Sequence, residues 1–170
     1  MQNNFIQQAQ IKFRQFQLDC ANSEEYQIAP LDGCMNCMVA VITGPLQTVW
    51  SGSSVSMYIW FPESDFNIPP KCYFYPVIYH PNVDLSTGKI CLNFLSVNWQ
   101  SKSTLEGIIV AARTLLENPN CESPLNQAAA ELYLNNRGAY IEQVVQMLNK
   151  FEDFTLKQRN SGWEEHKKTL

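Results

Sequence analysis

A cysteine and an asparagine within one irregular stretch have the clearest chemical potential in this sequence. Residues 79–93 read YHPNVDLSTGKICLN, which places Cys91 nine residues after Asn82. Pro81 cannot donate to a strand ladder and turn-forming residues follow it, so we expect a loop with Cys91 at its lip. The thiol is the strongest nucleophile here, and a carboxamide N–H can stabilise an oxyanion. Ile90 and Leu92 beside the thiol do nothing to help it ionise, so the pattern favours exchange with an activated ester over attack on an amide.

Two alternatives compete with this interpretation. Cysteine is a common buried residue, and a lone cysteine is more often inert than catalytic. His80 also suggests a Cys–His hydrolase, in which an imidazole takes the proton of the thiol. The residues taken alone leave both alternatives open.

The same stretch resembles the active-site signature of the ubiquitin-conjugating enzymes. The resemblance rests on His80-Pro81-Asn82 and on the Gly-x-Ile-Cys-Leu-Asn run that contains Cys91, and it covers about residues 5–150. Further motifs stand in the family's order, namely Gly44-Pro45, Phe61-Pro62, Pro69-Pro70, Trp99, Leu115-Leu116, Pro119-Asn120 and Pro124-Leu125-Asn126. The resemblance implies an α+β fold with an N-terminal helix, a four-stranded antiparallel meander, an active-site loop, a central helix and two C-terminal helices.

The resemblance also implies roles for individual residues. Cys91 would accept a modifier protein as a thioester from an activating enzyme and pass it to a substrate lysine, usually with a ligase. Asn82 would stabilise the oxyanion of the second step, while His80 and Pro81 would hold the loop. Ser123 stands where many relatives have an aspartate near the incoming lysine. Neither a metal nor another cofactor is implied.

Composition limits the remaining classes of function. The chain has 170 residues, 45% of them hydrophobic, which suits one domain with a sizeable core. A formal net charge of −4 with only 16% charged residues argues against a nucleic-acid or membrane surface. No apolar run approaches the ~20 residues of a membrane span, and the first residues do not resemble a secretory signal. We expect a monomer in the cytoplasm, the nucleus or both.

Six cysteines allow two further interpretations. Their even number could form three disulfides, but the spacing is irregular and the expected compartment is reducing. Cys34-Met-Asn-Cys37 has the spacing of a zinc knuckle, yet no second pair stands nearby to complete four ligands. We therefore expect no metal and assign structural roles to the other cysteines, which are Cys20, Cys34, Cys37, Cys72 and Cys121.

Periodicity places the expected elements along the chain. Phe5, Ala9, Phe13 and Phe16 form the stripe of a first helix that ends near Leu18. Four strands are expected over residues 26–31, 37–43, 55–61 and 71–75. Ser103-x-x-Glu106 is a capping box before a central helix, and two more helices are expected over residues 125–134 and 140–151. Residues 1–152 would be the catalytic domain and residues 153–170 a polar, mobile extension.

Surfaces for partner proteins follow from the resemblance alone. In this family the first helix contacts the activating enzyme and ligases, which makes Lys12 and Arg14 candidates, although a solvated polar face explains them equally well. Asn67 stands in place of an aromatic residue at a ligase-facing position. Ser101 and Lys102 likewise replace Pro-Ala in the Trp-Ser-Pro-Ala run. These departures argue against the family's common ligases.

The modifier itself is open between two choices. The stretch around Cys91 and the segment after Pro124 resemble the neddylation branch, whereas that branch's lysine-rich leader is not found before the first helix. We place ubiquitin or a close relative first and a Nedd-type modifier second. A third reading is a non-enzymatic scaffold that binds ubiquitin through the same fold, but such scaffolds typically lack the cysteine.

Overall fold

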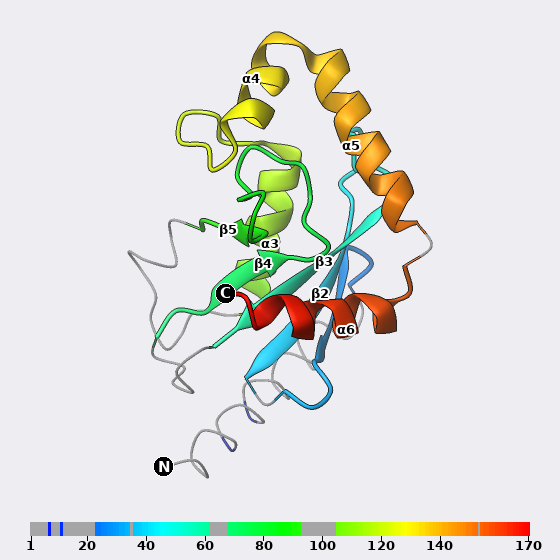
Figure 1. Ribbon diagram of the computed structural model, residues 1–170. Coiled ribbons are helices and arrows are strands. Elements are labelled where there is room, and N and C mark those ends of the chain that lie inside the picture. Colours follow the sequence, from blue (N-terminus) through cyan, green and yellow to red (C-terminus); the bar gives the residue numbers. More distant parts are fainter. Residues whose placement is uncertain are drawn as a thin grey trace.

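An antiparallel sheet forms the centre of the molecule. The computed structural model describes residues 7, 11, 23–34, 36–61, 68–92, 105–152 and 154–170. Within them the strands pair in sequence order, β1-β2-β3-β4-β5 (Figure 1). Their bounds are β1 Tyr26–Pro30, β2 Cys37–Thr43, β3 Ser54–Trp60, β4 Lys71–Phe74 and β5 Lys89–Ile90. Antiparallel pairing of each strand with the next one in the sequence makes this sheet a meander.

Alternation along the strands divides the sheet into two faces. In β3, Met57 and Ile59 belong to the larger buried cluster and Tyr58 between them to a second, smaller cluster. In β4, Cys72 and Phe74 likewise belong to the larger cluster and Tyr73 to the smaller one. We call the side of the larger cluster the inner face and the side of the smaller cluster the outer face, since successive strand residues point to opposite sides.

The inner face packs against helix α3, Leu105–Glu117. Its buried residues recur at helical spacing and form one apolar stripe, namely Leu105, Ile108, Ile109, Ala112 and Leu116. The stripe explains why this segment is a helix that lies against a sheet, because only one side of it needs to leave water.

Helices α4 and α5 lie beyond one end of the sheet (Figure 1). α4 spans Gln127–Asn135 and α5 spans Arg137–Phe151, and an asparagine caps the start of each. The Asn126 side chain accepts from the Ala129 N–H and the Asn136 side chain from the Ala139 N–H, both at 3.1 Å. Tyr140 and Val144 anchor α5 in the larger cluster.

Helix α6, Leu156–Lys167, covers the outer face (Figure 1). Thr155 begins it with a capping box, in which Thr155 and Gln158 satisfy each other's backbone N–H groups. Trp163 is the only buried residue of α6 and is 0% exposed. Its ring stacks on Tyr58 with centroids 4.6 Å apart and an interplanar angle of 16°. One aromatic side chain thus supplies most of the apolar contact of α6.

The α+β class is confirmed, and the four expected strands lie within one residue of the observed ones. Two elements differ from expectation. The short strand β5 was missed, and the segment expected to be a mobile extension forms α6 and packs on the sheet. Apart from residues 7 and 11, the expected first helix lies outside the described residues, and so does Ser103 of the expected capping box. None of the described helices has the length and apolarity needed to cross a bilayer.

Candidate active site

Cys91 is held at the surface by the short strand before it. β5 pairs with β4 through Ile90 opposite Cys72 and Lys89 opposite Tyr73. Ile90 and Leu92 are buried in the core on either side of Cys91, which is itself exposed. Alternation along an extended chain turns the middle side chain away from its neighbours. Burial of the two flanking residues therefore presents the thiol to solvent.

A tight turn before β5 fixes the path of the chain that leads to Cys91. The Asp84 carboxylate oxygen Oδ1 accepts four hydrogen bonds, from the backbone N–H and hydroxyl groups of Ser86 and Thr87, at 2.6–3.1 Å. The Ser86 and Thr87 side-chain hydrogen bonds, followed by the backbone ones, lower the pKa of Asp84 to about 2. The ionised carboxylate thus organises the turn at neutral pH.

Gly88 closes the turn against the sheet. Its φ of +75° lies in the left-handed region, and a Cβ atom there would overlap the carbonyl oxygen of Phe74. The Phe74 N–H donates to the Gly88 carbonyl at 2.8 Å, and the Gly88 N–H donates to the Asp84 carbonyl at 2.7 Å. No other residue fits this position without moving the turn.

His80 lies inside the molecule rather than in the pocket. It is 1% exposed, its Nε2–H donates to the Leu115 carbonyl at 2.9 Å, and its Nδ1 accepts from the Asn82 N–H at 3.0 Å. Burial lowers the pKa of the imidazole to about 4, against a small opposing effect of the Leu115 carbonyl. A neutral ring with both nitrogens engaged joins the loop to α3, and neither nitrogen is left to take a proton from a thiol.

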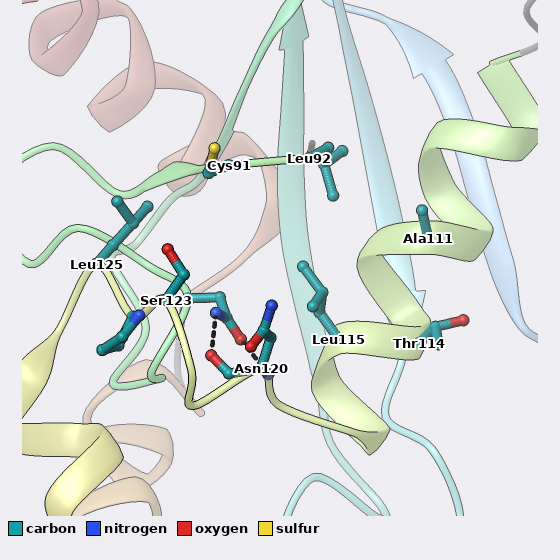
Figure 2. Close-up of a pocket in the computed structure, with 10 residues that line it drawn as sticks. Cys91, Leu92, Ala111, Thr114, Leu115, Asn120, Ser123 and Leu125 are labelled. Atoms are coloured by element: carbon teal, nitrogen blue, oxygen red, sulfur yellow. Dashed lines mark hydrogen bonds between the residues drawn. The ribbon is translucent and has the colours of Figure 1, made fainter. Parts of the chain in front are cut away.

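Asn82 braces two loops through its side-chain amide. Its Nδ2 donates to the Asn120 carbonyl at 2.7 Å, and its Oδ1 accepts from the Asn120 N–H at 2.8 Å (Figure 2). The pair imitates two bonds of a strand ladder between the Cys91 loop and the segment after α3. A carboxamide carries two N–H donors, so one remains beyond this pair.

Pro81 connects the same loop to the start of α4. Its carbonyl accepts from the Leu125 N–H and the Asn126 N–H, both at 2.9 Å. Asn126 is the N-cap of α4, so the loop and the helix start are held as one unit. His80, Pro81 and Asn82 thus each bond a different segment of the chain.

These segments surround a pocket of about 460 Å³ that reaches Cys91. Figure 2 shows α3 side chains, among them Leu115 and Thr114, along one side and Ser123 and Leu125 along the other. Asn82 and Asn120 also line the pocket, and Ser123 is exposed at it. Cys91 and Asn82, which belong to one loop, thus share a cavity with Ser123 from the segment after α3.

The remaining candidate residues lie outside the described part of the chain, namely Lys12, Arg14, Asn67, Ser101 and Lys102. Among the described residues, no cluster of three His, Cys, Asp or Glu side chains could hold a metal ion.

Sequence reasoning missed two residues that organise the site. Asn120 was quoted only as part of a motif, yet its backbone receives both groups of the Asn82 amide. Asp84 is one of the turn-forming residues after Pro81, and the Asp-x-Ser-Thr-Gly pattern around it is the signal that could have identified its bonding role.

Comparison with known proteins agrees with this geometry. The sequence model of the family described as "Ubiquitin-conjugating enzyme" matches residues 8–148. A ubiquitin-conjugating enzyme E2 2 of Aspergillus fumigatus is 35% identical over 111 residues, which cover 65% of this chain and 73% of the relative. The SUMO-conjugating enzyme UBC9 of Caenorhabditis elegans is 32% identical over 117 residues, which cover 66% and 70%.

A solved structure described as a novel ubiquitin-conjugating enzyme superposes with a TM-score of 0.70 at 28% identity, covering 82% of this chain and 91% of that one. The fold is that of the E2 enzymes. This chain belongs to the ubiquitin-conjugating enzyme family. The family in general works with ubiquitin or a ubiquitin-like modifier, an activating enzyme and a ligase.

Proposed function

We propose that Cys91 carries ubiquitin, or a close ubiquitin-like modifier, as a thioester and transfers it to a substrate lysine. The observation that carries this proposal is the exposed Cys91 thiol at a pocket lined by Asn82 and Ser123. The proposal explains why the chain keeps this thiol in solvent between two buried neighbours. A scaffold that only binds the modifier would not need it.

The first step is thiol exchange. The Cys91 thiolate attacks the carbonyl carbon of the thioester between the modifier and its activating enzyme, and the enzyme's sulfur leaves as a thiolate. The free energy of the new thioester is close to that of the old one, because a sulfur ester replaces a sulfur ester. The rigid turn ending at Gly88 keeps the nucleophile in place for this exchange.

The second step is aminolysis. A neutral lysine amine attacks the carbonyl carbon of the Cys91 thioester, an oxyanion forms, and the Cys91 thiolate leaves as the amine loses its proton. The N–H of Asn82 that Asn120 does not use is the donor suited to the oxyanion. Ser123, which lines the pocket and is exposed, offers a hydroxyl that suits an incoming lysine, and Glu122 before it in the sequence is also exposed.

Ubiquitin is our first choice of modifier. Relatives from several organisms that match this chain at 31–35% identity are named ubiquitin-conjugating enzymes. The chain is 32% identical to a SUMO-conjugating enzyme as well, so sequence identity at this level does not distinguish enzymes that carry different modifiers. A Nedd-type modifier is the second candidate, on the resemblance of residues 79–93 to that branch.

The deciding experiment is side-by-side charging with purified activating enzymes for ubiquitin, SUMO and the Nedd-type modifier, read on non-reducing gels. We expect a reducible adduct with ubiquitin in the wild type, none in Cys91→Ala, and a reductant-resistant oxyester in Cys91→Ser. Cys121→Ser is the matched control, because Cys121 is a half-buried thiol next to Asn120 and should leave charging unchanged. Normal charging of Cys91→Ala would refute the proposal.

The role of Asn82 is tested by comparing charging with discharge, because Asn82→Asp removes the bracing bond to the Asn120 carbonyl together with the spare N–H donor. Asn82→Asp keeps an oxygen acceptor for the Asn120 N–H but removes both side-chain N–H donors. We expect it to charge normally and to discharge to free lysine about 10²–10³ times more slowly. If charging and discharge fall together, Asn82 acts only as a brace.

A further inference from the structure

Cys34 and Cys37 form a dithiol beneath α6 that the reaction at Cys91 does not use. A backbone turn brings both cysteines into hydrogen bonds with Leu31. The Cys34 N–H donates to the Leu31 carbonyl, and the Leu31 N–H donates to the Cys37 carbonyl, both at 3.0 Å. Both thiols are free, with Cys34 half-buried and Cys37 2% exposed. They belong with Trp163 to the outer-face cluster.

A lysine that is distant in the sequence, Lys167, lies against this pair. The Lys167 ammonium lies 3.2 Å from the Cys34 sulfur and 3.2 Å from the Glu164 carboxylate. Lys167 follows Trp163 by one helical turn, so the buried indole fixes the ammonium over the thiol. A cation held at a thiol is the environment that makes a cysteine reactive.

The surroundings shift the pKa values of the two thiols in opposite directions. Hydrogen bonding by the Cys37 thiol, and to a lesser degree Lys167 and the Asn36 N–H, lowers the pKa of Cys34 to about 6 against the effect of burial. The pKa of Cys37 is raised, first by its interaction with the Cys34 sulfur and then by burial. The hydrogen bond that the Cys37 thiol donates to the Met38 carbonyl is long, at 3.9 Å. Asn36 Oδ1, 3.2 Å from the Cys34 sulfur, accepts from the protonated thiol and works in the opposite direction.

Two other groups complete these surroundings. The Glu164 carboxylate shares the Lys167 ammonium and so weakens its pull on Cys34. The Trp163 indole N–H has no partner of regular hydrogen-bond geometry in the described part of the chain, and it lies close enough to Cys37 to moderate the rise in that pKa. The charges around the pair therefore favour a thiolate on Cys34 and a thiol on Cys37.

We propose that Cys34 and Cys37 are an oxidisable dithiol in which Cys34 is the attacking sulfur, Cys37 the resolving sulfur and Lys167 the counter-ion, so that oxidation weakens the hold of α6 on the sheet. The oxidant is a peroxide. Once the sulfurs are joined, the Cys34 sulfur carries no negative charge for Lys167 to pair with. Glu164 then remains as the only anion facing Lys167 among the described residues.

The chemistry balances in two steps. The Cys34 thiolate attacks one oxygen of hydrogen peroxide, the O–O bond breaks, and a sulfenic acid and hydroxide form. The Cys37 thiol then attacks the sulfenic sulfur and forms the S–S bond, while its proton and the sulfenic hydroxyl leave as water. Two thiols are oxidised and one peroxide is reduced, with two waters as the final products.

This pair is separate from the catalytic centre. Neither cysteine lines the pocket that contains Cys91, and the two lie on the outer face where β2 begins. A metal site is a poorer use of the same residues, because two sulfurs alone do not complete a zinc site and no third ligand stands near in the described part of the chain.

The first test measures alkylation of Cys34 by iodoacetamide against pH, in a Cys20→Ser/Cys91→Ser full-length background, with Cys121 as internal reference. We expect a midpoint near pH 6 for Cys34 and a clearly higher one for Cys121. Lys167→Met should raise the Cys34 midpoint by about one unit or more. Lys168→Met is the matched control, since Lys168 pairs with Glu165 instead, and it should change nothing. A Cys34 midpoint equal to that of Cys121, or unmoved in Lys167→Met, would overturn the proposal.

The second test treats the same background with hydrogen peroxide and maps the products by mass spectrometry. We expect a Cys34–Cys37 disulfide, and in Cys37→Ala a sulfenic acid on Cys34 that dimedone traps. Amide exchange over residues 156–167 should become at least several-fold faster after oxidation and recover after reduction. A disulfide that joins other cysteines, a sulfenic acid first found on Cys37, or unchanged exchange in α6 would each refute the proposal.

Discussion

The two faces of the sheet are covered by helices of different character. On the inner face α3 buries five apolar side chains, which are Leu105, Ile108, Ile109, Ala112 and Leu116, whereas α6 buries Trp163 alone on the outer face. The inner cluster continues into α4 and α5, whereas the outer cluster has only six buried members among the residues that the structure describes. Apolar burial spread over many side chains makes a helix part of the cooperative core, while apolar burial limited to one ring makes it separable.

Removal of the single anchor should have the largest effect. Trp163→Ala deletes a fully buried indole, a change that typically costs about 3–5 kcal/mol. The contacts that remain between α6 and the sheet are polar, such as those of Asn160 with Tyr58 and of Arg159 with Ser56, and each contributes less than the buried ring. We therefore expect α6 to detach while β2 and β3 keep their protection. Hydrogen exchange over residues 156–167 measures the loss, and Trp163→Phe, which can still stack on Tyr58, should lose less. Equal loss of protection in the strands would show that the two faces unfold as one.

The inner face should respond globally to a smaller truncation. Ile109→Ala removes part of a 0%-exposed side chain from the α3 stripe and should cost about 2–5 kcal/mol in the free energy of unfolding. Urea unfolding should show one transition at a lower midpoint, with α6 lost together with the core. Val110→Ala, at the exposed neighbouring position, should change stability by about 0.5 kcal/mol or less. A loss confined to α3 would contradict the cooperative view of the inner face.

The stability of the protein should also depend on pH through the buried His80. The unfolded chain binds a proton at this imidazole near pH 6.5 and the folded chain only near pH 4, so stability is full above 6.5 and falls as the pH drops toward 4. The shift corresponds to about 3 kcal/mol. His80→Gln should be less stable at pH 7.5 yet lose less between pH 7 and pH 4.5, as urea midpoints will show. Parallel curves for both proteins would mean that His80 titrates normally.

The smallest expected effect comes from replacing a glycine by alanine at two helix positions, one packed on the outer face and one open. A Cβ atom at Gly162 would meet the Tyr75 ring, with its closest atom 2.7 Å away, whereas one at Gly138 in α5 would find nothing closer than 3.8 Å. Alanine in a helix gains up to about 1 kcal/mol over glycine, so Gly138→Ala should stabilise the protein. Gly162→Ala should loosen α6 despite the same gain. Thermal melting and exchange in α6 compare the two, and equal stabilisation would show that Tyr75 moves aside without cost.

The same contrast explains what the sequence could predict. The α3 stripe and the alternation of β3 carry their own burial pattern, so these elements were placed closely. α6 is polar around Trp163 and has no stripe, so nothing local showed that its one large ring would be buried. Tyr58 and Tyr73 look like solvent-facing strand positions until α6 covers them.

The candidate site divides in a similar way. Cys91 and Asn82 could be singled out from residue type and signature, because the chemistry is local to one stretch. The Asn82–Asn120 brace joins residues 38 apart, and the bond from His80 to Leu115 joins residues 35 apart. Such pairs depend on how the loops meet after folding, and periodicity does not contain that information.

The position of α6 along the chain decides when the outer face is covered during synthesis. The last full strand ends at Phe74, whereas α6 begins at Leu156, and its Asn160 bonds Tyr58 across 102 residues. Chains are made from the N-terminus and form local contacts first, so the sheet can assemble around α3 before α6 has emerged. Until then the rings of Tyr58 and Tyr73 remain uncovered. A ribosome-bound chain therefore displays an aromatic surface that the finished protein hides, and that surface is of the kind that chaperones engage.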